Sequence, residues 1–128
     1  MKKREKILKK KKDWIFYTTR ILSILFLLFL TLFSLDVFDS CANFLECSLA
    51  LLMHNLPVLI LLILFIFAWR YELVGAITFT LAGIAYIITT MIRVPWYLAL
   101  SWGMIIALPC FFVAVLYYLS WKRKKCLY

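Results

Sequence analysis

The sequence predicts an all-α integral membrane protein, a four-helix transmembrane bundle with both ends of the chain on one side of the membrane. Hydrophobic residues make up 66% of the 128 residues, whereas soluble domains contain roughly 45–50% apolar residues. They are gathered in four long segments, each near the ~20 residues that a helix needs to cross the hydrocarbon core. A single domain of this length cannot bury so many apolar side chains away from water. This composition excludes soluble enzymes, disordered tails, secreted disulfide scaffolds and nucleic-acid-binding domains.

Four segments qualify as spanning helices. We expect them at about 14–37, 47–69, 73–92 and 95–121. The first lies between Asp13 and Asp36 and is interrupted only by Arg20, whose long side chain can reach the headgroups from the helix end. The third lies between Glu72 and Arg93, and the fourth ends at the final basic run. The chain then divides into a basic tail, the four-helix domain and a second basic tail, at residues 1–13, 14–121 and 122–128.

The positive charges predict the orientation. Eight Lys and Arg residues precede the first helix, and four follow the last. Arg20 and Arg70 fall on the same side in a four-helix arrangement, so fourteen of the fifteen basic residues share that side and only Arg93 lies opposite. Because such residues concentrate in cytoplasmic loops, we expect both termini inside (N-in/C-in). The tails then contact an anionic inner leaflet. They have no aromatic interleaving, so we expect no nucleic-acid partner.

Small residues form one stripe on each of the last two predicted helices. Residues at alternating steps of three and four share a helix face, and small side chains let helices approach closely in lipid. The stripe on the third helix is Gly75, Thr78, Ala82, Ala85 and Thr89, and the stripe on the fourth is Ala99, Gly103, Ala107, Cys110 and Ala114. We expect these two helices to pack on each other. Pro57 and Pro109 each leave one carbonyl without its helical partner and predict kinks.

Polar residues near the outer face are the first candidate site. His54 and Asn55 lie deepest in the second helix, where polar and ionisable groups are costly and often functional. Asp36 and Arg93 would join them where the chain reverses. We interpret His54 as a structural residue bonded to a backbone carbonyl. A metal site needs three or four ligands, and this is the only His in the chain, so we expect no metal and no cofactor.

Two further pairs are candidates for contacts between segments. Arg20 and Glu72 form a candidate ion pair at the inner face, either a pin for the turn between the second and third helices or a gate. Cys41 and Cys47 bracket a short outer loop on the oxidising side. A disulfide between them is plausible there, but their geometry decides whether it forms.

Three local strings resemble a family of small prokaryotic membrane proteins. They are Arg20-Ile21-Leu22-Ser23-Ile24 leading to Leu35-Asp36-Val37-Phe38, then His54-x-x-Pro57, then Ala68-Trp69-Arg70-Tyr71-Glu72-Leu73-Val74-Gly75. The family is known only as a domain of unknown function with four predicted helices, and the resemblance extends from about Arg20 to Trp121. The resemblance implies the fold, the topology and a location in a prokaryotic cell membrane, and it supplies no activity. The outer loop at 39–47 departs from the Gly-rich loop typical of that family.

The expected function is that of a small integral membrane protein that is not an enzyme. We expect it to act through lipid or another membrane protein, including a second copy of itself. An enzyme would need a cluster of nucleophile, base or metal ligands, and one His with scattered thiols does not supply it. The alternative is a subunit of an oligomeric transporter or channel for small molecules or ions. A proton-coupled exporter is disfavoured because no Asp or Glu lies within an apolar segment.

Overall fold

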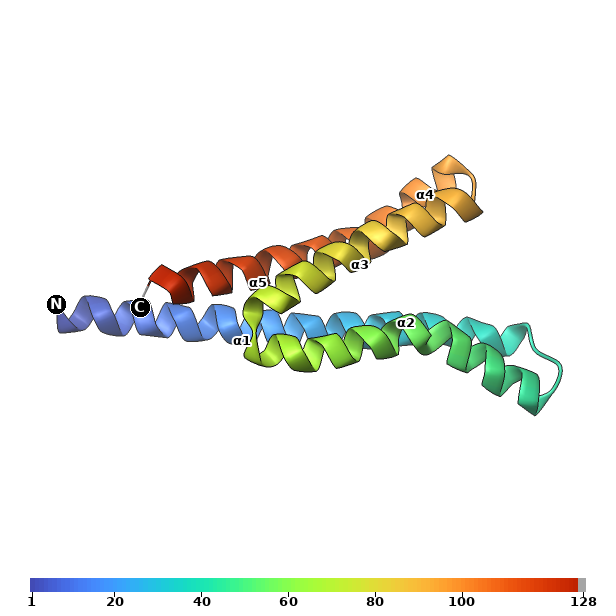
Figure 1. Ribbon diagram of the computed structural model, residues 1–128, viewed down its shortest axis with the longest axis horizontal. Helices are drawn as coiled ribbons and strands as arrows, with labels where there is room; N and C mark the ends of the chain where they lie inside the picture. The colour runs from blue at the N-terminus through green and yellow to red at the C-terminus, as the bar shows by residue number, and fades with distance from the viewer. Residues whose placement is uncertain (127–128) are drawn as a thin grey trace.

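The structure, a computed structural model, is a V-shaped assembly of helices (Figure 1). It describes the backbone of residues 1–126 and the side chains of residues 1–7 and 14–126. The elements are α1 (Lys2–Phe33), the 3-10 helix η1 (Ser34–Asp39), α2 (Phe44–Arg70), α3 (Glu72–Arg93), α4 (Trp96–Trp102), the π-helix η2 (Gly103–Ala107) and α5 (Leu108–Cys126). Four spans are long and apolar enough to cross a membrane: Trp14–Asp39, Phe44–Arg70, Glu72–Arg93 and Trp96–Cys126. The predicted all-α fold with four apolar helices is confirmed.

The helices differ from the prediction in two main respects, the start of the first helix and the interior of the fourth span. The first helix begins at Lys2 rather than near residue 14, because Lys, Arg and Glu favour helix and an acidic residue in the first turn suits the helix dipole. The side chains of Lys9 to Lys12, in the predicted basic tail, lie outside the described residues. The fourth span contains the π-helix η2, in which the Leu108 N–H donates to the Gly103 carbonyl. This wide turn comes just before Pro109, which cannot donate a backbone hydrogen bond.

The four spans form two helical hairpins that meet at one end of the molecule and diverge at the other (Figure 1). The first hairpin is α1, η1 and α2, and the second is α3, α4, η2 and α5. We call the end that carries both chain termini and the α2–α3 turn the terminal end, and the opposite end the loop end. Across the junction, α1 packs on α5, and α2 packs on α3. The hairpins therefore share a core only where they meet.

The shared core lies in the terminal-end half. Its buried members are Phe26, Leu27, Leu61, Phe65, Ala68, Ala76, Phe79, Cys110, Val113, Ala114 and Tyr117. After Leu27, only Ser34 is buried up to the end of η1, and α2, which is described throughout, buries no residue before Leu61. The loop-end half of the first hairpin is consequently held by α1, η1 and α2 alone.

The helices with the small-residue stripes, α3 and α5, make the most extensive contact between any two elements. Two glycines give the closest approach. A Cβ added at Gly75 would lie 2.7 Å from the Tyr117 ring, and one added at Gly83 would lie 2.9 Å from the Phe111 ring. Gly83 is outside the predicted stripe, so the packing face of α3 is rotated relative to that stripe.

The remaining stripe residues divide between buried and exposed positions. Thr78 is buried and Ala82 is half-buried, whereas Ala85 and Thr89 are exposed. In the fourth span the buried members are Ala99, Ala107, Cys110 and Ala114. Gly103 is half-buried, and a Cβ there would meet nothing within 4 Å.

Alanine substitutions at the three glycines should rank by these contacts. We expect Gly75→Ala to lower the free energy of unfolding by about 1–3 kcal/mol, the usual cost of overpacking, because Tyr117 is fully buried and cannot move aside. Gly83→Ala should cost less, since Phe111 is only half-buried. Gly103→Ala should be neutral or stabilise the helix by up to about 1 kcal/mol. Unfolding in mixed micelles measures all three, and equal effects at Gly75 and Gly103 would contradict this packing.

Candidate functional site

Six polar side chains are buried at the terminal end, where the two hairpins meet. We call them the terminal polar cluster, and they are Thr19, Arg20 and Ser23 of α1, Glu72 of α3, and Tyr117 and Ser120 of α5. The three α1 residues lie on consecutive turns of that helix, and Ser120 follows Tyr117 by three residues on α5. Residues at this spacing share one helix face. Three helices therefore bring their hydrogen-bonding groups together inside an otherwise apolar core.

Arg20 ties α1 to the end of α2. Its side chain is 3% exposed, so it does not extend to the headgroups as the sequence suggested. One guanidinium nitrogen donates to the Trp69 carbonyl at 2.7 Å, and the other donates to the Phe16 carbonyl at 3.2 Å. The last carbonyls of a helix lack helical partners, and Trp69 lies in the last turn of α2. Arg20 thus satisfies the end of the neighbouring helix.

The guanidinium of Arg20 also lies against aromatic rings. Its Cζ is 3.2 Å from the centroid of the Phe16 ring and 5.3 Å from the centroid of the Trp69 ring. Both distances are within the ~6 Å at which a cation is attracted to a ring face. The planar, delocalised cation suits this position better than an ammonium group would.

Glu72 contributes a second buried charge to the cluster. It is the first residue of α3 and is 5% exposed, and a carboxylate at a helix N-terminus is favoured by the helix dipole. Glu72 and Arg20 are near enough for their charges to interact, but no direct ion pair joins their described atoms. Arg20 Nε and Glu72 Oε2 are both buried without a hydrogen-bond partner. Arg20 and Glu72, the candidate inner ion pair, are therefore buried in the same cluster without bonding to each other, because the guanidinium bonds to backbone carbonyls instead.

Hydroxyl groups extend the cluster from α1 to α5. Ser23 Oγ donates to the Thr19 carbonyl at 2.7 Å, and a 3.3 Å hydrogen bond joins Ser23 Oγ to Tyr117 Oη. Since a serine hydroxyl has one proton, Tyr117 is the donor when Ser23 bonds to the carbonyl. Sequence reasoning missed Tyr117, because a tyrosine near a helix end looks like an interfacial aromatic. The i, i+4 pair Thr19 and Ser23 beside Arg20 was the available signal.

The four residues predicted to converge at the outer face are not brought together. Asp36 and His54 are exposed on the first hairpin. Asn55 instead accepts a 2.8 Å hydrogen bond from Ser34, which fastens α2 to η1. Arg93 ends α3 on the second hairpin, and the hairpins diverge toward this end of the molecule (Figure 1). Their separation is set by the angle between the hairpins, which the sequence pattern does not contain.

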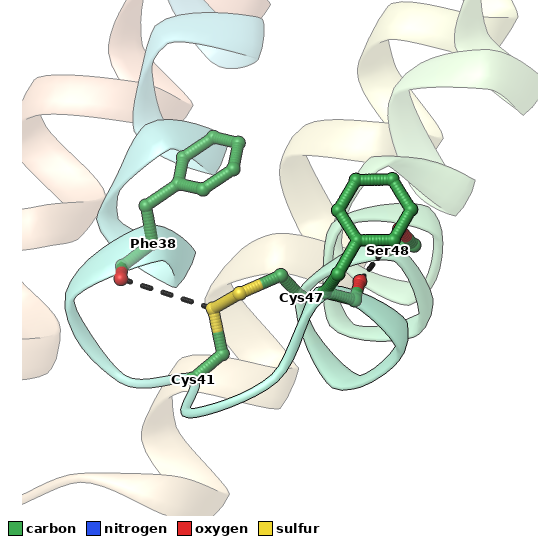
Figure 2. Close-up of a disulfide and its surroundings, with 5 residues drawn as sticks. Phe38, Cys41, Cys47 and Ser48 are labelled. Carbon is green, nitrogen blue, oxygen red and sulfur yellow. Dashed lines mark hydrogen bonds between the residues drawn. A yellow bond between two sulfur atoms is a disulfide. The ribbon is translucent and has the colours of Figure 1, made fainter.

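A disulfide closes the connection between η1 and α2. It joins Cys41 to Cys47, with a Cα–Cα distance of 5.3 Å. The Cys41 sulfur is 3.8 Å from the Phe38 carbonyl oxygen. The Ser48 hydroxyl donates to the carbonyl of Phe44 in the first turn of α2, and both contacts are drawn in Figure 2. The bridge therefore fixes the loop end of the first hairpin, at the opposite end of the hairpin from the terminal polar cluster.

Metal binding has no support in the described part of the chain, where no group of three or more His, Cys, Asp or Glu side chains could hold an ion. The terminal polar cluster instead offers one cation, one carboxylate and several hydroxyls, and three of its members, Arg20, Ser23 and Tyr117, make hydrogen bonds between helices. Its arrangement suits holding the two hairpins in a fixed relation.

One family model covers nearly the whole chain. Residues 4–127 match the model described as Domain of unknown function (DUF7670). The chain belongs to this family. The match includes all three strings that suggested a domain of unknown function with four helices, and that resemblance is confirmed. No curated protein and no solved structure matches the chain. The description of DUF7670 names no activity, so the function must be argued from the geometry.

The two bonds from Arg20 predict that a lysine cannot replace it. Arg20→Lys keeps the charge but removes the planar fork that reaches two carbonyls and stacks on two rings. We expect the free energy of unfolding to fall by about 2 kcal/mol, the usual scale for a hydrogen bond from a charged group. Arg70→Lys is the matched control, because Arg70 is exposed at the end of α2 beside the cluster and should change stability by less than about 0.5 kcal/mol. Equal losses in the two variants would rule out the role given to the fork.

Proposed function

We propose that this multi-pass membrane protein is non-catalytic and acts by binding another membrane protein within the bilayer, at the loop end of the first hairpin. The observation that supports the proposal is the position of His54. It lies about three turns inside α2, within an apolar span, and its side chain is exposed. This half of α2 has only α1 and η1 to cover it, because the second hairpin packs on the other half.

An exposed imidazole at this depth favours a partner helix. Polar groups in hydrocarbon are costly when they lack a hydrogen-bond partner, and a hydrogen bond between transmembrane helices contributes roughly 1 kcal/mol. The adjacent Asn55 is already bonded to Ser34. A neighbouring helix that presents a hydrogen-bonding group would satisfy His54 and cover the apolar residues beside it.

The same proposal includes an orientation, with both termini in the cytoplasm of a prokaryotic cell. The four basic residues after Trp121 are at the terminal end, and the disulfide is at the loop end (Figure 1). Basic residues favour the cytoplasmic side, and disulfides persist on the oxidising side. The basic residues and the disulfide therefore both favour a cytoplasmic terminal end.

Cysteine labelling tests this orientation. In sealed right-side-out vesicles an impermeant maleimide should label nothing before reduction, and should label Cys41 and Cys47 after an impermeant reductant. Cys126, which is free and exposed, should react only in inside-out vesicles. The control variant Cys126→Ser should abolish the labelling of inside-out vesicles, which assigns that labelling to Cys126. Labelling of Cys126 from the outside would reverse the topology.

Photo-crosslinking tests the proposed partner contact. A benzoylphenylalanine at Met53, an exposed position next to His54, should give a discrete crosslinked protein in native membranes. We expect His54→Leu to reduce that product severalfold and His54→Gln, which keeps a hydrogen-bonding group, to retain most of it. The same probe at Met91, an exposed residue of the second hairpin, should not give the product. An unchanged yield with His54→Leu would refute the proposal, and loss of a solute flux in that variant without any crosslink would favour a transporter.

A further inference from the structure

An apolar groove of about 520 Å³ lies between α3 and α5. Ala76 and Ala114 are buried and form its floor, whereas Ile77, Val115 and Tyr118 are exposed and form its rims. Its volume is within the range of roughly 300–1,000 Å³ for ligand-binding pockets. The groove belongs to the second hairpin, so it is separate from the surface around His54 that carries the proposed function.

The stripe of α5 that borders the groove continues into the basic tail. Steps of three and four residues from Val115 lead through Tyr118 to Lys122 and Lys125, which places all four on one helix face. The helix continues to Cys126, and both lysines are exposed. Lys125 Nζ also lies 5.2 Å from the centroid of the Trp121 ring. Two ammonium groups thus follow the apolar groove at the terminal end.

We propose that this groove binds one anionic phospholipid from the leaflet at the terminal end. An acyl chain occupies the groove, and the phosphate lies against Lys122 and Lys125. The order of chemistry along the stripe, apolar and then cationic, matches the order in a phospholipid from chain to headgroup. A partner transmembrane helix fits less well, because it would have to cover two charged lysines at its end. Basic residues next to a bilayer attract anionic lipids. By holding one acyl chain, the groove confines that attraction to a single lipid at a single site.

Native mass spectrometry of the full chain, released from mixed micelles, tests the charged half of the site. The probes are phosphatidylglycerol and phosphatidylcholine with identical acyl chains. We expect the protein to retain one phosphatidylglycerol in preference to phosphatidylcholine. Lys122→Gln/Lys125→Gln should weaken phosphatidylglycerol binding about 30-fold at low ionic strength, the loss of two such attractions.

The matched control removes the same charge from other faces of α5. Arg123→Gln/Lys124→Gln should change phosphatidylglycerol binding by less than about threefold, because neither residue is on the groove stripe. Equal losses in the two double variants would mean that the attraction is diffuse and that no local site exists. Equal retention of the two lipids by the unmodified protein would also overturn the proposal.

A second pair of variants tests the apolar half. Val115→Trp should fill the groove and release the bound phospholipid. Ile88→Trp makes the same change on α3 beyond the groove, at a residue with the same 53% exposure, and should leave binding intact. Retention of phosphatidylglycerol by Val115→Trp would show that the groove is not the site. Because all the substituted side chains are exposed, the core is left in place in every variant.

Discussion

Tyr117 makes the contacts on which the junction of the two hairpins depends. Its ring is fully buried, stacks on Phe79 with 5.7 Å between centroids, and lies where a side chain at Gly75 would otherwise be. Its hydroxyl reaches Ser23 on the opposite hairpin. One residue of α5 therefore contacts α1 by a hydrogen bond and α3 by ring packing. A smaller residue would leave a cavity at the centre of the core, and any side chain at Gly75 would displace the ring.

The position of this junction explains why the two ends of the molecule differ. At the terminal end, buried charges and hydroxyls are shielded by both hairpins, and Arg20 adds a bond to the end of α2. At the loop end, the first hairpin is closed by its own contacts, the Cys41–Cys47 disulfide and the hydrogen bond between Ser34 and Asn55. The first hairpin thus has closing contacts of its own where the second does not cover it. This division leaves the loop-end half of the first hairpin uncovered by the second hairpin.

The sequence predicts the parts of this structure that depend on local properties. The four spans follow from the length and composition of continuous segments, and the packing of α3 on α5 follows from small residues at helical spacing. The structure does not contain the predicted cluster of Asp36, His54, Asn55 and Arg93. Whether these residues meet depends on the angle between the hairpins, which the sequence pattern does not give. The burial of Arg20 was missed because it depends on packing between helices, in which the end of α2 lies against the guanidinium. The packing role of Gly83 was not predicted, because a stripe of small residues locates the packing face of a helix only to within one residue.

The two hairpins are joined at the terminal end and diverge at the loop end. Double electron–electron resonance in lipid tests this arrangement, using exposed positions in a Cys126→Ser background with the native disulfide intact. One spin-label pair, at Leu49 and Met91, reports the loop end, and the other, at Tyr17 and Tyr118, reports the terminal end. We expect a clearly longer mean distance for the loop-end pair. Equal, short distances for both pairs would indicate a closed parallel bundle and would contradict it.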